Sequence, residues 1–231
     1  MTLGVLGGTF DPIHFGHIAA GRRAQESLGL DGVLIVPSLI PPHRTAGASP
    51  TARLEMTKLA AADLPGWTAS DLELRRDGPS YTFDTLTELA NIRRGEAAMS
   101  ELRGDAASGA ANRVEWKFFF IIGADAFAEI ATWSRYPAVL DLAHFAVVAR
   151  PGITLDSLQK RLPNLAERMT TPAAYRPDDA PRVILIQAET PDISSTEIRR
   201  RVRAGESVTG LVPESVASYI ATHHLYVEAT P

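Results

Sequence analysis

Hydrophobic residues in this chain fall into short unbroken runs, separated by longer segments in which apolar residues recur at helical spacing. Runs rich in aromatic and β-branched residues are typical of strands that are covered on both faces. The runs comprise Leu3 to Leu6, Val33 to Val36, Phe118 to Ile122, Phe145 to Val148 and Val183 to Ile186. In addition, Leu72 and Leu74 alternate with charged residues, which predicts a half-exposed strand over 71–75.

The segments between these runs predict helices. Phe15 to Leu28 is rich in alanine and is followed by Gly29, a residue favoured just after a helix. The other predicted helices comprise Thr51 to Ala62, Thr82 to Ile92, Asp156 to Leu162, Ser195 to Ala204 and Glu214 to Thr222. Strands that alternate with helices predict an α/β fold, a doubly wound parallel sheet with helices on both faces and a small C-terminal helical segment.

The chain length of 231 residues favours one domain over residues 1–231. Residues 91–115 interrupt the alternation, because they are rich in glycine and alanine and contain few larger aliphatic side chains. We expect a flexible surface insertion there, with a lid or a subunit contact as the alternative.

Composition narrows the classes of function. The chain has no cysteine, which excludes disulfides, thiol nucleophiles and cysteine-ligated metal sites. A formal net charge of -4 argues against nucleic acid as a partner, and no apolar run has the length of a membrane span. We therefore expect a cytoplasmic protein; a homodimer is one possible assembly.

The most informative stretch follows the first predicted strand and reads Gly-Gly-Thr-Phe-Asp-Pro-Ile-His-Phe-Gly-His over 7–17. A glycine turn that leads into a helix N-terminus favours a bound phosphate. His14 and His17 share one face of the first turn, with Gly16 between them, and can donate to phosphate oxygens. A zinc site lacks an evident third ligand, and neither the G-x-G-x-x-G fingerprint nor a Walker lysine is present.

The string resembles the H-x-G-H signature of the nucleotidyltransferase superfamily, and in its fuller form that of the bacterial nicotinate-nucleotide adenylyltransferases. The resemblance implies a Rossmann-like fold and transfer of AMP from ATP to nicotinate mononucleotide. It implies that His14 and His17 are catalytic. It also implies ATP contacts from Gly7, Gly8, Thr9, Phe10 and Gly16.

A second motif, Ile-Ser-Ser-Thr-Glu-Ile-Arg over 193–199, follows the last predicted strand. Ser194 and Glu197 have the spacing of a capping box, so a helix is expected to begin there. Hydroxyls at a helix start, with an arginine one turn later, can bind phosphate. The motif matches the same family, and the resemblance implies that Ser195, Thr196 and Arg199 hold the phosphates of ATP. Taken alone, a capping box with a solvated basic face would explain these residues better.

Three middle segments corroborate the resemblance. The Ser-Tyr-Thr sequence over 80–82 implies that Thr82 binds the nicotinate end, although a simple helix cap is the alternative. Gly123 and Asp125 end the strongest strand and are implied to contact ATP, with a cap at Asp125 as the alternative. Trp133 is implied to stack on the pyridine ring, although tryptophan is more often a core residue.

Two arginines complete the implied acceptor site. Arg44 lies in a Pro-Pro-His-Arg segment where the family usually has lysine, so its role is open. Arg150 precedes Pro151 after the fifth predicted strand.

We therefore expect an adenylyltransferase that takes ATP and nicotinate mononucleotide as substrates. Mg²⁺ is expected to enter with ATP, without a metal site made by the protein. One alternative is a related transferase whose acceptor is nicotinamide mononucleotide or phosphopantetheine, or one that transfers a cytidylyl group. The other is a nucleotide-binding sensor without catalysis, which should lack His17 or Arg199.

Overall fold

The computed structural model describes residues 1–42, 45–92, 116–149, 153–177 and 179–227. Most of the predicted insertion at 91–115 lies outside these residues. The strands are β1 Thr2–Gly8, β2 Gly32–Pro37, β3 Trp67–Ala69, β4 Lys117–Gly123, β5 His144–Ala149, β6 Met169–Thr170 and β7 Val183–Gln187. The helices are α1 Phe15–Leu28, α2 Pro50–Ala62, α3 Thr82–Ile92, α5 Ala124–Phe127, α6 Leu155–Arg161, α7 Ser195–Arg203 and α8 Glu214–Thr222.

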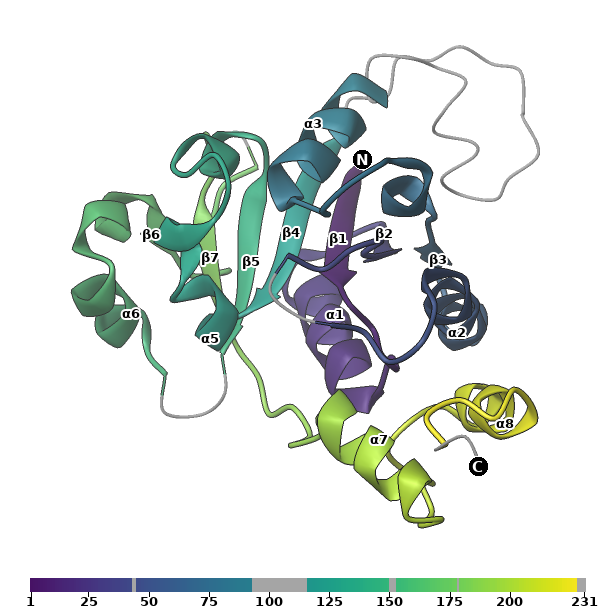
Figure 1. Ribbon diagram of the computed structural model, residues 1–231. Coiled ribbons are helices and arrows are strands. Elements are labelled where there is room, and N and C mark those ends of the chain that lie inside the picture. The colour runs from purple at the N-terminus through teal and green to yellow at the C-terminus, as the bar shows by residue number, and fades with distance from the viewer. Residues whose placement is uncertain (43–44, 93–115, 150–152, 178, 228–231) are drawn as a thin grey trace.

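All seven strands are parallel and form one sheet in the order β3-β2-β1-β4-β5-β7-β6. The chain builds outward from β1 through β2 and β3 and then returns to place β4 on the other side of β1 (Figure 1). In such sheets, ligands bind beyond the carboxyl ends of the strands at this reversal. The fold confirms the predicted doubly wound α/β architecture and places a candidate site beyond β1 and β4.

Alternate residues of the central strands enter two separate cores. Val5 and Phe120 belong to one buried cluster, which α3 and α5 cover, whereas Leu6 and Phe119 belong to the other, beneath α1 and α2. Helices lie on both faces of the sheet in Figure 1, with α7 and α8 beyond its carboxyl edge. The unbroken apolar runs of the sequence therefore reflect strands buried on both sides.

The predicted half-exposed strand over 71–75 is wrong. Residues Leu72–Arg75 form a 3-10 helix, and the strand β3 ends just before it. Leu72 and Glu73 are both buried, so the alternation of apolar and charged residues does not separate a buried face from an exposed one. Glu73 stays buried because the hydroxyl of Thr85 donates to its carboxylate.

Candidate active site

The loop after β1 crosses the carboxyl edge of the sheet. A Cβ atom at Gly8 would lie 3.0 Å from the ring of Phe10, and one at Gly7 would lie 3.1 Å from the ring of Phe120. These glycines therefore make room for aromatic rings as well as for a turn. Phe10 has a positive φ of 49°, and its side chain is buried, so this residue can meet a ligand only through its backbone.

The two histidines of the motif form a stacked pair at the start of α1. Their ring centroids are 3.7 Å apart and their planes differ by 26°. Gly16 N–H donates to His14 Nδ1 at 3.1 Å, and His14 N–H donates to His17 Nδ1 at 3.3 Å. Because both Nδ1 atoms accept hydrogen bonds, the proton of each neutral ring lies on Nε2. Each ring therefore presents an Nε2–H donor on the side away from the backbone.

Burial sets the charge of the first ring. The pKa of His14 is lowered to about 4, because desolvation disfavours the imidazolium. His14 is thus a neutral hydrogen-bond donor at pH 7, and a Cβ atom at Gly16 would come within 3.0 Å of its ring.

One expectation about α1 needs correction. The sequence predicts that free amides of its first turn bind phosphate, but these amides are already engaged. Phe15 N–H donates to the carbonyl of Leu211 at 3.0 Å, and His17 N–H donates to that of His14 at 2.9 Å. Together with the Gly16 bond, this leaves the imidazoles as the donors at this helix end.

The first turn of α7 is fastened to the same loop. Ser195 Oγ donates to the carbonyl of Pro12 at 3.0 Å, and Arg199 Nη1 donates to that of Asp11 at 2.7 Å. Arg199 Nη2 also donates to Thr196 Oγ1 at 3.3 Å. The two end motifs of the chain are therefore in direct contact, as the predicted phosphate site requires.

The capping box predicted for α7 is only half present. Glu197 N–H donates to Ser194 Oγ at 3.2 Å. The Glu197 side chain turns outward and accepts from Arg200 and Arg201 instead. Its pKa falls to about 2, chiefly because of the hydrogen bond from Arg200.

Gly123 and Asp125 lie where β4 ends. Both are exposed, and space is open around the Cα atom of Gly123 where a side chain would project. Asp125 lies inside α5, whose N-cap is Gly123, so the alternative of a cap at Asp125 is wrong. Both residues are free to face a ligand at the reversal of the strand order.

Hydrogen bonds bring the N-terminus of α3 to this edge. Ser38 N–H donates to the carbonyl of Gly8 at 2.9 Å, and Leu39 N–H donates to Ser80 Oγ at 2.9 Å. Thr82, two residues further on, is the first residue of α3. The amide of a first helical residue has no partner inside its helix and can meet an anion.

Trp133 lies on the same side of the sheet as α3. Its half-buried ring meets Phe120 edge-on, with centroids 6.0 Å apart. Two residues later, the guanidinium of Arg135 lies 5.8 Å from the centroid of the Phe83 ring, which joins this loop to the first turn of α3. Thr82 and Trp133 thus stand on adjoining segments. Trp133 is both a packing residue and partly exposed.

The structure adds residues that sequence patterns do not reveal. Arg53 of α2 is only 1% exposed, and its guanidinium donates to the carbonyls of Thr9, Ser38 and Leu39 at 2.8, 2.6 and 3.0 Å. It therefore ties the loops after β1 and β2 together. Arginine in the middle of a helix carries no local signal for such a role.

Some predicted residues are not brought together here. Arg44 and Arg150 lie outside the described residues.

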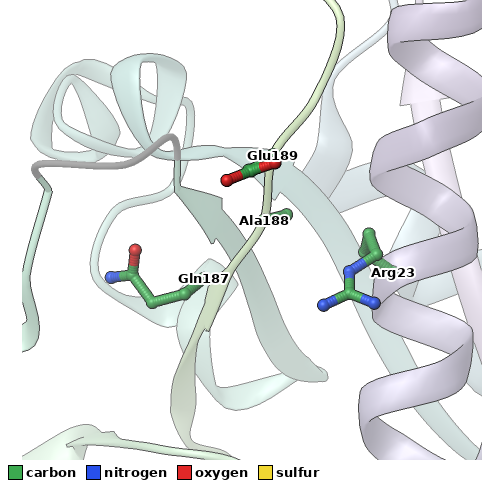
Figure 2. Close-up of a pocket in the computed structure, with 4 residues that line it drawn as sticks. All are labelled: Arg23, Gln187, Ala188 and Glu189. Carbon is green, nitrogen blue, oxygen red and sulfur yellow. The ribbon is translucent and has the colours of Figure 1, made fainter.

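An open hollow of about 610 Å³ lies between α1 and the end of β7, lined by Arg23, Gln187, Ala188 and Glu189 (Figure 2). This hollow borders the carboxyl edge of the sheet, but none of the predicted site residues lines it.

In the part of the chain that the structure describes, no helix has the length and apolar character to cross a membrane.

Comparisons with known proteins agree with this geometry. The cytidylyltransferase-like family model matches residues 5–201. A probable nicotinate-nucleotide adenylyltransferase of Citrifermentans bemidjiense is 38% identical over 99% of this chain and 100% of its own length. One from Thermus thermophilus is 40% identical over 98% of this chain and 100% of its own.

A solved structure shares the fold. The nicotinic acid mononucleotide adenylyltransferase of Plasmodium falciparum, in complex with NaAD, superposes with a TM-score of 0.68 over 97% of each chain, at 16% identity. At this identity the likeness concerns the fold alone, whereas the bacterial relatives match in sequence from end to end. The chain therefore belongs to the cytidylyltransferase-like family and, within it, to the nicotinate-nucleotide adenylyltransferases.

Proposed function

We propose that this chain transfers AMP from ATP to nicotinate mononucleotide, forming nicotinate adenine dinucleotide and pyrophosphate in NAD biosynthesis. The names of the relatives support this activity, and the P. falciparum structure that shares the fold holds NaAD. The observation that carries the proposal is the stacked His14–His17 pair. The pair follows the loop whose Asp11 carbonyl accepts from Arg199 of the second motif, at the reversal of the strand order.

The reaction needs positioning and charge stabilisation rather than a covalent intermediate. A 5′-phosphate oxygen of nicotinate mononucleotide forms a bond to the α-phosphorus of ATP. The bond from that phosphorus to the bridging oxygen of the leaving pyrophosphate breaks, and the oxygen keeps the electron pair. Donors that point at the α-phosphate and at the leaving oxygens lower this barrier.

The imidazoles and the guanidinium have different roles in this stabilisation. His14, with its lowered pKa, donates as a neutral ring through Nε2–H, and His17 donates beside it. Arg199 supplies the permanent positive charge and can contact two phosphate oxygens of the leaving group at once. Thr196 adds a hydroxyl, whereas the hydroxyl of Ser195 already donates to the Pro12 carbonyl. As the first two residues of α7, Ser195 and Thr196 both add amides that lack helical partners.

At the acceptor end, Thr82 and the first turn of α3 receive the nicotinate carboxylate, and Trp133 stacks on the pyridine ring. The positive end of the α3 dipole favours the anion over a neutral amide. We assign Gly123 and Asp125 to the ATP side, because they follow β4 directly beside β1.

Mg²⁺ enters with ATP as part of the substrate. Besides the exposed carboxylate of Asp125, the groups assigned to the site are imidazole, guanidinium, hydroxyl and amide donors, which bind phosphate oxygens. Hard cations prefer carboxylate, carbonyl and water oxygens. The reaction takes place in the cytoplasm, where ATP is supplied. The oligomeric state, with a homodimer as one possibility, stays a prediction.

The test is pyrophosphate release from purified protein with ATP and each acceptor in turn. Nicotinate mononucleotide should give the highest kcat/KM. A higher value with phosphopantetheine, or with CTP in place of ATP, would establish the related transferase instead. Nucleotide binding without any release of pyrophosphate would establish a sensor.

A further inference from the structure

The carboxylate of Asp11 contacts three segments that are distant from it in the sequence. Asp11 is 3% exposed, yet its oxygens meet several donors. Gly47 N–H donates to Oδ2 at 2.6 Å, and Ala48 N–H donates to Oδ1 at 2.9 Å. Tyr226 Oη donates to Oδ1 at 2.9 Å, and Arg199 Nη1 lies 3.5 Å from Oδ2. A buried charge with this many partners is held firmly in place.

Asp11 in turn holds Arg199. Arg199 Nη1 donates to the backbone carbonyl of Asp11 and also forms the ion pair with the Asp11 carboxylate. Asp11 therefore holds this side of the guanidinium through two contacts. The side chain is 20% exposed, and an arginine has five N–H donors in a fixed fork. The N–H donors that neither Asp11 nor Thr196 uses are left for phosphate oxygens, and the contacts with Asp11 set their direction.

Tyr226 comes from the far end of the chain. It follows α8, has a positive φ of 65°, and packs against the same core cluster as α1 and α2. Burial, together with the charge of Asp11, raises the pKa of its hydroxyl well above the usual range. The hydroxyl therefore remains a proton donor at every physiological pH.

Gly47 supplies independent evidence that these groups form one packed unit. A Cβ atom at this position would touch Arg199 Cδ, Asp11 Oδ2 and Tyr226 Cδ1, each at 3.4 Å. The three side chains therefore converge around a single backbone position. Because the packing is this close, a substitution at one of these residues alters the positions or energies of the others.

We propose that Tyr226 is a positioning residue for the nucleotidyl transfer, because its hydroxyl fixes the Asp11 carboxylate that orients Arg199 toward the phosphates of ATP. This inference rests on the proposed function, in which Arg199 holds the leaving pyrophosphate. It assigns to the C-terminal segment a part in the site that neither end motif contains. It also explains why Asp11 is buried rather than exposed to ligand.

The test is Tyr226→Phe, which removes the hydroxyl and keeps the ring. We expect KM for ATP to rise about threefold to tenfold, the size of a typical coupling between contacting residues. KM for nicotinate mononucleotide should change less than about twofold, since Arg199 does not face the acceptor. Tyr175→Phe is the matched control. Its hydroxyl lies 3.4 Å from His144 Nε2 at the opposite edge of the sheet, and its loss should change neither KM.

A double-mutant cycle separates positioning from general stability. In an Arg199→Lys background, Tyr226→Phe should have little further effect on KM for ATP, because the fork that it orients is gone. Multiplying effects of the two substitutions would overturn the proposal. So would an equal rise in both KM values for Tyr226→Phe.

The same cycle, measured as calorimetric binding of inorganic pyrophosphate, needs no turnover. Wild-type protein that releases no pyrophosphate from ATP and nicotinate mononucleotide would overturn the proposed function. The coupling between Tyr226 and Arg199 in pyrophosphate binding would still support or overturn the present inference. The two failures are thus distinguishable.

Discussion

His14 and His17 stack with ring centroids 3.7 Å apart, and each ring uses Nδ1 to accept an amide hydrogen bond from the start of α1. The pair therefore caps the helix and aims its Nε2–H groups with the same set of contacts. A flexible donor would lose entropy on meeting the transition state, whereas these two rings are oriented beforehand.

Replacement of His17 by alanine should lower kcat by two to three orders of magnitude, because one preorganised donor at the developing charge contributes about 3–4 kcal/mol. Pyrophosphate release under saturating substrates measures the loss. His17→Ala also removes a helix-capping contact, so Thr154→Ala serves as the control. Thr154 caps the remote helix α6 by accepting from Ser157 N–H at 3.1 Å. A His17→Ala variant with more than about a tenth of the wild-type rate would contradict the assigned role.

Replacement of Thr82 by proline should reduce the preference for nicotinate over nicotinamide mononucleotide. Proline is well tolerated at the first position of a helix, so this change removes the amide donor without breaking α3. We expect the wild-type ratio of kcat/KM values to be about ten- to a hundredfold, since mispaired polar groups cost about 1–3 kcal/mol.

Thr82→Val is the matched control, because it keeps the amide and removes only the hydroxyl. If the ratio is preserved in Thr82→Val and lost in Thr82→Pro, the backbone amide of residue 82 is the group that recognises the carboxylate. Equal kcat/KM for the two acceptors in the wild-type protein would contradict this assignment.

Replacement of Trp133 by alanine should raise KM for both mononucleotides by a similar factor. An indole that stacks on a cationic pyridine ring contributes about 0.5–2 kcal/mol without distinguishing acid from amide. Steady-state kinetics with each acceptor measure the effect. A change confined to one acceptor would show that Trp133 contacts the carboxylate or carboxamide group rather than the shared ring.

Replacement of Glu73 by glutamine should destabilise the fold and raise KM for nicotinate mononucleotide. The buried carboxylate accepts from Thr85 in the first turns of α3 and lies 3.6 Å from Arg76. Loss of hydrogen bonds to a buried charge costs about 1.5–3 kcal/mol. Thermal unfolding of the variant measures this cost. Glu26→Gln breaks an exposed 3.1 Å ion pair with Arg23 and should cost less than about 1 kcal/mol.

Stability should fall as the pH drops from about 6.5 to 4. Burial lowers the pKa of His144 to about 4, with Lys117 acting in the same direction and Asp179 opposing it. The unfolded chain therefore binds this proton first, so unfolding is favoured below the ordinary pKa of 6.5, by about 3 kcal/mol at pH 4. Burial lowers the pKa of His14 in the same way and adds to the slope.

His144→Asn isolates the contribution of this histidine. Asparagine can still accept the Arg182 amide that now donates to His144 Nδ1 at 3.1 Å, but it does not titrate. Unfolding free energies from denaturant titrations at pH 7, 5.5 and 4 should fall less steeply than in the wild-type protein. An unchanged pH dependence would mean that His144 binds its proton equally well in the folded and the unfolded chain, which would contradict the lowered pKa.

Local sequence patterns predicted the central strands and most helices, because burial on both faces of a parallel sheet requires unbroken apolar runs, which are visible in the sequence. Short elements could not be predicted in this way, because they contain no long apolar run. The two residues of β6 and the four of α5 contain too few positions to show a period, and the alternation around Leu72 indicated a strand where a 3-10 helix forms. The motif residues His14, His17 and Arg199 were also evident from sequence, since their spacing at two helix starts is itself a local feature.

How these motifs are joined could not be predicted from local patterns, because it depends on contacts between distant segments. The contacts of Asp11 with Gly47, Arg199 and Tyr226 span 36, 188 and 215 residues of sequence. The periodicity of the sequence does not reveal such pairs, because each of these residues is ordinary within its own segment. The structure also showed that the first amides of α1 are already bonded and that the imidazoles take their place as donors. Hydrogen bonding inside a folded chain depends on which donors reach which acceptors in space, and that is settled only when the distant segments pack.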